Sequence, residues 1–186
     1  MIIDMDNRGF TIVELIVIIA VMGILLIFSV VNLGSSQANG RDSERKTDAE
    51  TIALQLESFY TSGEDISTTV GRYPSTAIFT GGANTMKRML RDIDTKSITA
   101  PGITDPVITF VASYNNTPIA DTIKSAPGGT GITKDQYIYQ PLKNDNSLCQ
   151  SESDECRKFN LYYKLEIATA DCPAPNNVCM IMSSKQ

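Results

Sequence analysis

An acidic side chain near the start of a long apolar run constrains this chain more than any other feature. Residues 8–25 read RGFTIVELIVIIAVMGIL, and the 26 residues from Leu15 to Gly40 carry no charge. At about 1.5 Å per residue, a helix from Phe10 to Val31 is long enough to cross a hydrocarbon core of about 30 Å. The sequence therefore predicts a membrane segment, with the carboxylate of Glu14 inside it.

A cleaved secretory signal and a retained anchor both fit such a segment. Residues 15–28 have the apolar length of a secretory signal, and residues 36–38, Ser-Gln-Ala, offer small side chains at a cleavage point. The front end fits poorly, because a secretory leader needs a positive N-terminal region, and residues 1–14 hold Arg8 against Asp4, Asp6 and Glu14. The charges favour the retained anchor.

The carboxylate of Glu14 needs a cation, because an ionised acid at bilayer depth costs a few kcal/mol and is usually paired. Arg8 lies six residues earlier, which is not a helical neighbour spacing. A cut between Gly9 and Phe10 would create an amine one helical turn from Glu14. That amine can pair with Glu14 of the same chain or of a neighbouring copy.

Residues 8–15, Arg-Gly-Phe-Thr-Ile-Val-Glu-Leu, followed by the apolar helix, resemble the class III signal of type IV prepilins and pseudopilins. The resemblance implies that a membrane prepilin peptidase cleaves after Gly9, that Phe10 is then N-methylated, and that Glu14 aligns subunits in a filament. Two features depart from the family. The leader is acidic, although a start at Met5 would remove one acid, and no proline occurs between Phe10 and Tyr60.

The region after the apolar run predicts a second, amphipathic stretch of helix. Residues 32–40, NLGSSQANG, are weak helix formers, so we expect a bend there or a stretch that melts when packed. From Arg41 to Tyr60, apolar residues recur at helical spacing opposite a charged face. Asp42 can pair with Arg45 or Lys46 at that spacing, and we interpret these charges as a solvated face.

This second stretch resembles the major pseudopilins of type II secretion, and similar sequences occur in bacterial type IV pilins. The matching residues are 41–48, Ile52, Leu56, Tyr60 and the run Gly71-Arg72-Tyr73-Pro74. Residues 64–70 lengthen a loop that such proteins usually keep short. The resemblance spans residues 8–74, and beyond Pro74 only patterns remain.

The C-terminal part predicts a small antiparallel sheet with one short helix. The helix is expected at residues 84–93 and the strands at 107–113, 136–142, 160–167 and 178–182. In the third strand Leu161, Tyr163, Leu165 and Ile167 alternate with polar neighbours, which predicts one buried and one solvated face. The inner face is expected on the apolar stripe of residues 41–60. Residues 126–133, APGGTGIT, predict a loop, because they lack the Gly-Lys-Ser/Thr ending of a phosphate-binding loop.

All four cysteines lie near the C-terminus, which suggests local disulfides. Cys149 and Cys156 share the spacing C-x6-C with Cys172 and Cys179, and of the three possible connectivities these two local loops are the simplest. Such bonds persist in an oxidising compartment, and each is worth about 2 to 2.5 kcal/mol. Free or metal-binding thiols are the alternative, although this spacing is not a usual short metal motif.

Composition argues against catalysis and nucleic-acid binding. The chain has no His, the usual general base and metal ligand, and its net charge of -5 offers no basic field for phosphates. We expect no cofactor. An acid-rich loop supplies oxygen donors of the type that calcium uses, although a solvated charge run fits its spacing better; its acids are Asp145, Glu152, Asp154 and Glu155.

Taken together, these features predict an α+β, pilin-like fold, with a long N-terminal helix packed against a small antiparallel β-sheet head. The expected parts are a leader, residues 1–9, a helix, residues 10–62, whose first part to residue 33 is transmembrane, and a disulfide-stapled head, residues 63–186.

The expected function is that of a structural subunit of a type IV pilus or pilus-like filament, a homo-oligomer processed by prepilin peptidase and assembled by pilus machinery. It would move from a single-pass position in the cytoplasmic membrane to the cell surface. A type II secretion pseudopilin and a monomeric membrane-anchored binding module are the alternatives. A soluble enzyme cut after Ala38 is disfavoured by the missing His.

Overall fold

The computed structural model describes residues 10–63, 70–77, 90, 93–103, 110–112 and 132–184. Its main helix, α1 (Ile12–Ser62), runs for 51 residues, and the chain divides into two compact units, Met1–Ala38 and Asn39–Gln186. We call residues 12–38 the N-terminal half of α1 and residues 39–62 its C-terminal half. Each half is described within its own unit.

The segment 32–40 is helical throughout, so the chain is not interrupted there. Weak helix formers such as those in this segment cost up to about 1 kcal/mol each, and a helix already nucleated on both sides propagates across them cooperatively. The boundary between the two compact units falls inside this segment, after Ala38. The expectation that the segment melts when packed remains a prediction.

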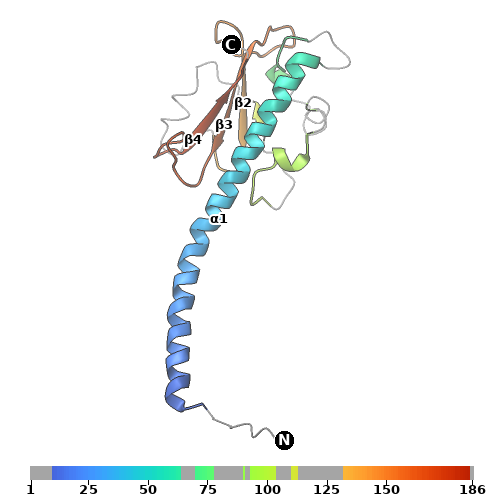
Figure 1. Ribbon diagram of the computed structural model, residues 1–186. Helices are drawn as coiled ribbons and strands as arrows, with labels where there is room; N and C mark the ends of the chain where they lie inside the picture. The colour runs from blue at the N-terminus through green and yellow to red at the C-terminus, as the bar shows by residue number, and fades with distance from the viewer. Residues whose placement is uncertain are drawn as a thin grey trace, which may run out of the picture. The chain divides into compact units, whose positions relative to one another are not determined.

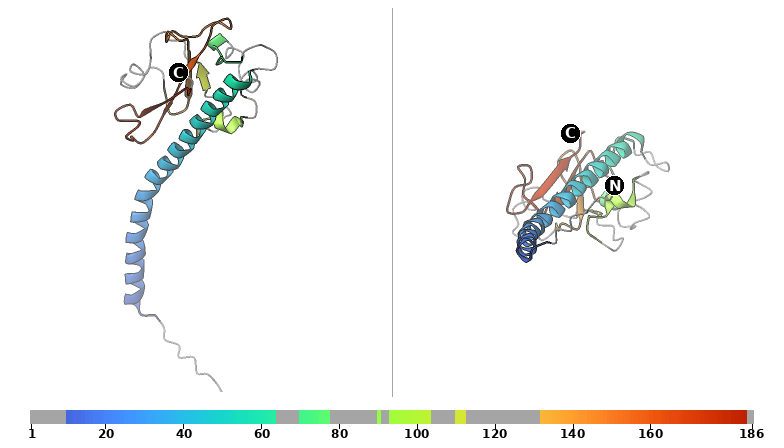
Figure 2. Two further views of the ribbon diagram at one scale, coloured as in Figure 1. Left: turned by 45° about the horizontal axis from the view of Figure 1, so that its top comes forward. Right: turned by 60° about the horizontal axis from the view of Figure 1, so that its bottom comes forward.

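In the second unit α1 lies along a four-stranded sheet of order β1-β2-β3-β4 (Figures 1 and 2). The strands are β1 (Phe110–Ala112), β2 (Tyr137–Leu142), β3 (Lys158–Lys164) and β4 (Val178–Met182), and a short 3-10 helix, η2, covers Thr95–Ile98. The β2-β3-β4 part is antiparallel, which confirms the predicted α+β arrangement. The edge strand β1 differs, because it pairs with β2 in parallel.

The core forms where the C-terminal half of α1 meets one face of the sheet. The apolar stripe of the helix packs in one cluster with alternate residues of β2 and β3, as the sequence predicts. Alternation explains the arrangement, since every second side chain of a strand points to the same face. The buried members include Ala49, Ile52, Ala53 and Leu56 from the helix, and Tyr137, Tyr139, Phe159, Leu161 and Tyr163 from the sheet.

The prediction of a solvated outer face for β3 is wrong at its centre. Tyr162 is fully buried in a second cluster with Ile132, Ile138 and Val178, on the opposite side of the strand from Leu161. Its hydroxyl donates to Oε1 of Gln140, 2.9 Å away, so the buried polar group is satisfied. The strand also ends at Lys164, which leaves Leu165 and Ile167 beyond it.

Three charged side chains of the C-terminal half of α1 do not belong to a solvated face, which corrects our interpretation for them. Asp42, Arg45 and Asp48 are buried, and Arg45 is only 2% exposed. Asp42 does pair with Arg45, at 2.9 Å, as its helical spacing allows. The reason for the burial lies far along the chain, because Glu166 also pairs with Arg45.

The helix ends where the sequence places a glycine. Gly63 adopts a φ of 69°, and its N–H donates to the carbonyl of Phe59, 2.8 Å away, a C-terminal cap that glycine allows at little steric cost. The run 71–74 then returns to the helix end, where the ring of Tyr73 lies 4.7 Å from that of Tyr60. The motif that resembles pseudopilins therefore serves to close the core.

Several predicted elements lie outside the described residues. These are most of the helix at 84–93, most of the glycine-rich loop at 126–133, and the ends of the strand predicted at 107–113, of which the structure describes Phe110–Ala112.

Candidate assembly site

The first turn of α1 is closed by reciprocal hydrogen bonds between Thr11 and Glu14. The backbone N–H and the hydroxyl of Thr11 each donate to Oε2 of Glu14 at 2.8 Å, and the N–H of Glu14 donates back to the Thr11 hydroxyl at 3.2 Å. Because the helix begins at Ile12, Thr11 is its N-cap and Glu14 its third residue. This arrangement is a capping box, in which both side chains satisfy backbone donors that the helix leaves free.

The capping box gives Glu14 a role that our interpretation of the sequence missed. We considered the acid only as a charge in need of a cation, but the pattern Thr-x-x-Glu before an apolar run is itself a signal for a helix start. Near an apolar phase the effect matters more than in water, because uncapped N–H groups have no water to bind. The carboxylate is thus held by its own chain before any cation approaches.

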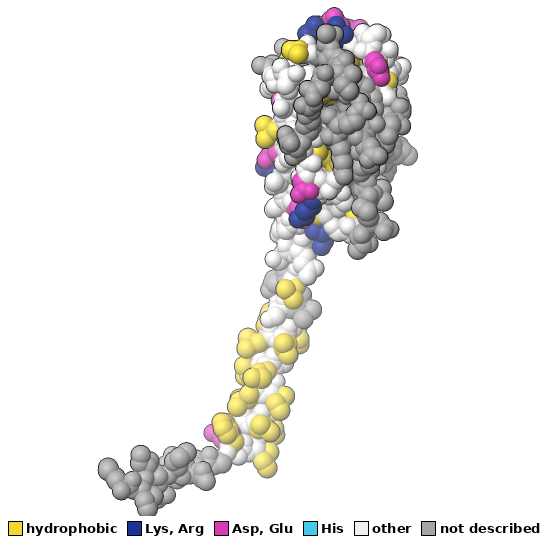
Figure 3. All heavy atoms as spheres, turned by 90° about the vertical axis from the view of Figure 1, so that its right-hand side faces the viewer, with side chains coloured by type: hydrophobic (Ala, Val, Ile, Leu, Met, Phe, Trp, Pro, Cys, Tyr) yellow, Lys and Arg dark blue, Asp and Glu magenta, His cyan; other side chains and the backbone are white. Residues whose placement is uncertain are grey.

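The N-terminal half of α1 exposes apolar side chains on every side. Among the side chains of this half that the structure describes, the large apolar ones range from 40% exposed at Ile18 to 78% at Ile12, and none of them is buried. Figure 3 shows apolar side chains gathered along this stretch. A helix that is apolar all round is stable only in a membrane or in contact with other apolar surfaces. By length and composition, α1 is the one helix among the described residues that can cross a membrane.

The few small or polar residues of this stretch do not disturb it. The hydroxyl of Ser29 donates to the carbonyl of Leu25 at 2.9 Å, so its hydrogen bond is made within the helix. A Cβ added at Gly23 would meet open space, with no other atom within 4 Å apart from its chain neighbours and the nearby helix backbone. Phe10, the predicted first residue after cleavage, is 78% exposed, and Gly9 lies outside the described residues.

In the second unit, an ion-pair cluster of Arg41, Asp42, Arg45 and Glu166 fastens the chain beyond β3 to the helix. Glu166 accepts from Nε and Nη2 of Arg41, both at 2.7 Å, and from Nη1 of Arg45 at 2.9 Å. These arginines lower the pKa of Glu166 to about 2, with the hydrogen bond from Arg41 as the largest cause. Planar guanidinium groups suit such two-pronged contacts.

Asp42, the other acid of the ion-pair cluster, binds backbone N–H groups as well as a cation. Asp42 accepts from the N–H groups of Glu166 and Ile167, at 2.9 and 3.0 Å, besides its bond with Arg45. Arg45 in turn donates through Nε to the carbonyl of Lys134 at 3.0 Å. The cluster therefore joins one turn of α1 to the segments that precede β2 and follow β3.

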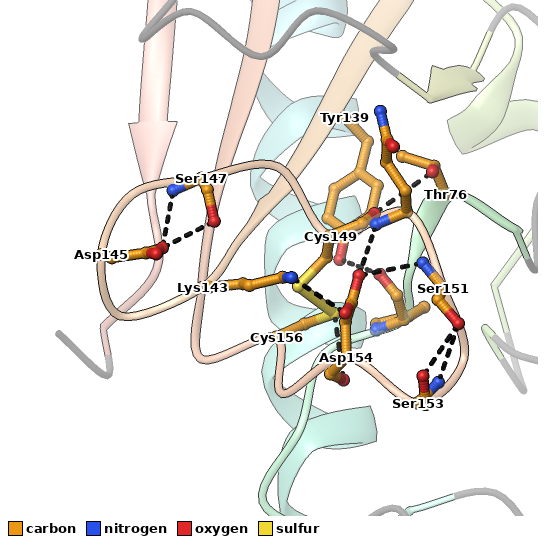
Figure 4. The surroundings of a disulfide bond; sticks show 12 residues. Thr76, Tyr139, Lys143, Asp145, Ser147, Cys149, Ser151, Ser153, Asp154 and Cys156 are labelled. Carbon is orange, nitrogen blue, oxygen red and sulfur yellow. Dashed lines mark hydrogen bonds and ion pairs between the residues drawn. A yellow bond between two sulfur atoms is a disulfide. The ribbon is translucent and has the colours of Figure 1, made fainter.

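The cysteines form two local disulfides, Cys149 with Cys156 and Cys172 with Cys179, the loops that their spacing favours. Figure 4 shows the first of them. Both sulfur pairs are buried, with the Cα atoms of Cys149 and Cys156 5.8 Å apart. Backbone bonds join this loop to the run after the helix, including one from Thr76 N to the carbonyl of Cys149 at 3.1 Å.

Asp145 and Asp154 bind the backbone of their own loop (Figure 4), whereas Glu155 pairs with Arg157 at 3.2 Å and with Arg72 at 3.4 Å. Asp154 accepts from the N–H groups of Gln150 and Ser151, at 2.9 and 3.0 Å, and pairs with Lys143 at 2.9 Å. The hydrogen bond from Ser151 is the largest cause that lowers the pKa of Asp154, to about 2. The carboxylate of Asp145 accepts a hydrogen bond from the N–H of Ser147 at 2.9 Å. The structure does not bring these acids together, and it arranges no group of three or more acidic or cysteine side chains for a metal ion in the part of the chain that it describes.

Comparisons with known proteins match the N-terminal region. Residues 4–30 match the family model for the prokaryotic N-terminal methylation motif. The type IV major pilin protein PilA of Myxococcus xanthus (strain DK1622) is 37% identical over 54 residues, which are 29% of this chain and 24% of that relative. The chain thus spans about a quarter of its relative's length, and no solved structure matches it. In this N-terminal region, with its methylation motif and apolar helix, the chain is similar to type IV pilins.

Proposed function

We propose that this chain is a structural subunit of a type IV pilus or pilus-like filament. The observation that carries the proposal is the N-terminal half of α1, which is apolar on every side, is exposed along its length, and begins with a capped acid. Such a surface must be covered by lipid or by other helices. A filament subunit is covered by lipid before assembly and by the helices of other subunits after it. The role is structural, without catalysis.

The proposed sequence of events begins in the cytoplasmic membrane, where the helix spans the bilayer once. A prepilin peptidase cleaves between Gly9 and Phe10, and the new amine of Phe10 is methylated. Assembly machinery then moves the subunit from lipid into a filament. There the apolar helices of many copies bury one another, and each buried CH2 group contributes about 0.8 kcal/mol if it leaves water and far less if it leaves lipid.

Because lipid is as apolar as leucine, the apolar helix by itself gives little preference for one stagger between copies. A charge pair in such surroundings is directional, and an unpaired charge is costly. We propose that the Glu14 carboxylate of one copy forms an ion pair with the Phe10 amine of its neighbour, and that this pair sets the stagger between copies. The head, carried by the C-terminal half of α1, is displayed on the filament surface.

Mass spectrometry of the native N-terminus and electron microscopy test this proposal together. We expect a mature chain that begins at methylated Phe10, and surface filaments that disappear when the gene is deleted. In Glu14→Ala, cleavage should persist while filaments are lost. An intact leader without self-association would contradict the proposal and would favour a monomeric membrane-anchored binding module.

The same microscopy addresses the alternative of a type II secretion pseudopilin. Its support is the likeness of residues 41–48 and 71–74 to the major pseudopilins. A pseudopilin predicts short periplasmic filaments and a secretion defect on deletion, whereas a pilus predicts long filaments outside the cell.

A further inference from the structure

We propose that Thr11 is a positioning residue for Glu14, an inference that rests on the proposed filament function. Two donors of Thr11, its backbone N–H and its hydroxyl, both bind the same carboxylate oxygen of Glu14, Oε2, at 2.8 Å. The return bond from the N–H of Glu14 to the same hydroxyl, at 3.2 Å, fixes the hydroxyl itself. The carboxylate is therefore held at the start of the helix, next to the predicted cleavage point.

The two carboxylate oxygens of Glu14 are used unequally. Oε2 carries both bonds from Thr11, whereas Oε1 accepts no hydrogen bond from the described residues. One oxygen thus belongs to the helix cap, and the other keeps its lone pairs available. An amine of another copy can approach Oε1 without first breaking the cap.

Nothing else described near Glu14 can hold its side chain. The neighbouring residues Ile12, Val13 and Leu15 are apolar and exposed, at 78%, 69% and 55%. A free glutamate side chain samples many rotamers, and fixing one of them costs free energy at the moment of binding. Thr11 removes that cost in advance, so the carboxylate meets a neighbouring amine already in place.

The test compares Thr11→Val, which keeps the shape and the N–H but loses the hydroxyl, with Thr11→Ser, which keeps the hydroxyl. Ser29→Ala is the matched control, because it removes a hydroxyl from the same apolar stretch without contact with Glu14. We expect filament yield to fall about fivefold in Thr11→Val, the ratio that corresponds to a typical N-cap hydrogen bond. Thr11→Ser and Ser29→Ala should assemble like the unmodified chain.

A second readout separates positioning from general support of the helix. The full chain, labelled with 13C at glutamate carboxyl carbons, is placed in phosphatidylcholine vesicles, and the Glu14 signal is assigned by its loss in Glu14→Gln. We expect this signal to move in Thr11→Val and to stay in place in Thr11→Ser. Uncleaved chain gives the same reading, so a variant that the peptidase fails to process still decides the question.

The outcomes distinguish this inference from the function on which it rests. An unmoved carboxyl signal in Thr11→Val, or full filament yield from it, overturns the positioning role while a Glu14→Ala defect keeps the filament function intact. Equal damage from Thr11→Ser and Thr11→Val also overturns it, because the hydroxyl would then be irrelevant. Normal filaments from Glu14→Ala overturn the proposed pairing itself.

Discussion

The two halves of α1 belong to one continuous helix, yet they are used in opposite ways. In the N-terminal half, apolar side chains such as Ile19 are exposed, and the described residues provide nothing to cover them. In the C-terminal half, even the guanidinium of Arg45 is buried, because the sheet and its loops pack around it. The comparison teaches that both halves form helix, but only the C-terminal half is covered by other segments of this chain. The N-terminal half needs lipid or other molecules to cover it.

Loss of the central cation of the ion-pair cluster should have the largest effect on the C-terminal half. Removing one partner of a buried pair costs about 3 to 5 kcal/mol, because the other charge is left without compensation. We therefore expect Arg45→Ala to lower the free energy of unfolding of the head by about that amount, as measured by denaturant titration of the detergent-solubilised full chain. Lys46→Ala, at the exposed next residue, is the control. A loss no larger than that of the control would show that the cluster contributes little.

Two leucines two residues apart separate a buried from an exposed position on the same helix. Leu56 is 0% exposed and Leu54 is 70% exposed. Leu56→Ala should cost about 2 to 5 kcal/mol, from lost burial and from the cavity that remains. Leu54→Ala should change stability by less than about 0.5 kcal/mol in the same titration. Equal effects would mean that the packing of α1 against the sheet is described wrongly.

A charge placed in the N-terminal half should act on membrane insertion and leave the head folded. Ile19 is 62% exposed, and an aspartate there faces a cost of about 2.5 to 3.5 kcal/mol at the centre of a bilayer. We expect Ile19→Asp to reduce membrane-inserted protein, measured by carbonate extraction of membranes. Leu54→Asp, an equivalent change in the C-terminal half, should remain inserted. Full insertion of Ile19→Asp would argue against this span.

The pH dependence of head stability should be the smallest of these effects. Burial raises the pKa of Asp48 from 3.8 to about 6, against the lowering effect of its hydrogen bond from Tyr137. The folded state therefore binds this proton more tightly than the unfolded state, and stability falls as pH rises from about 4 to 6. Glu166, with its pKa lowered to about 2, acts in the opposite sense, since its contribution is present above about 4.5 and lost as pH falls below that.

Between pH 4.5 and 6 we thus assign the fall in stability to Asp48. Asp48→Asn, which can still accept from Tyr137, should flatten the slope of unfolding midpoint against pH in that window. Glu50→Asn, at an exposed acid two residues along the helix, should keep the slope. An unchanged slope in Asp48→Asn would show that another group titrates there.

Local patterns predicted this protein well where one stretch of chain decides the outcome. The apolar run from Leu15 specifies a membrane-length helix whatever follows it, because its length and lack of charge suffice. Cys149 and Cys156 stand close enough in sequence to pair in a short loop. The capping box was also readable from Thr11 and Glu14, and we missed it by considering only the charge.

The remaining features depend on contacts that no local pattern reports. Helical spacing places Asp42 and Arg45 on the same side of α1 as the apolar stripe, but it cannot show that Glu166, 121 residues beyond Arg45, arrives there. The carboxylate of Glu166 then pairs with Arg45, and its backbone N–H donates to Asp42. Alternation along the strand places Tyr162 on the opposite face from Leu161, but it does not show that Ile132 and other residues bury Tyr162 there. The sequence by itself determined the helix, its apolar surface and its capped acid, since these arise within a few turns of chain. The tertiary structure alone decided which charges and strand faces are buried, because burial depends on segments that only folding brings together.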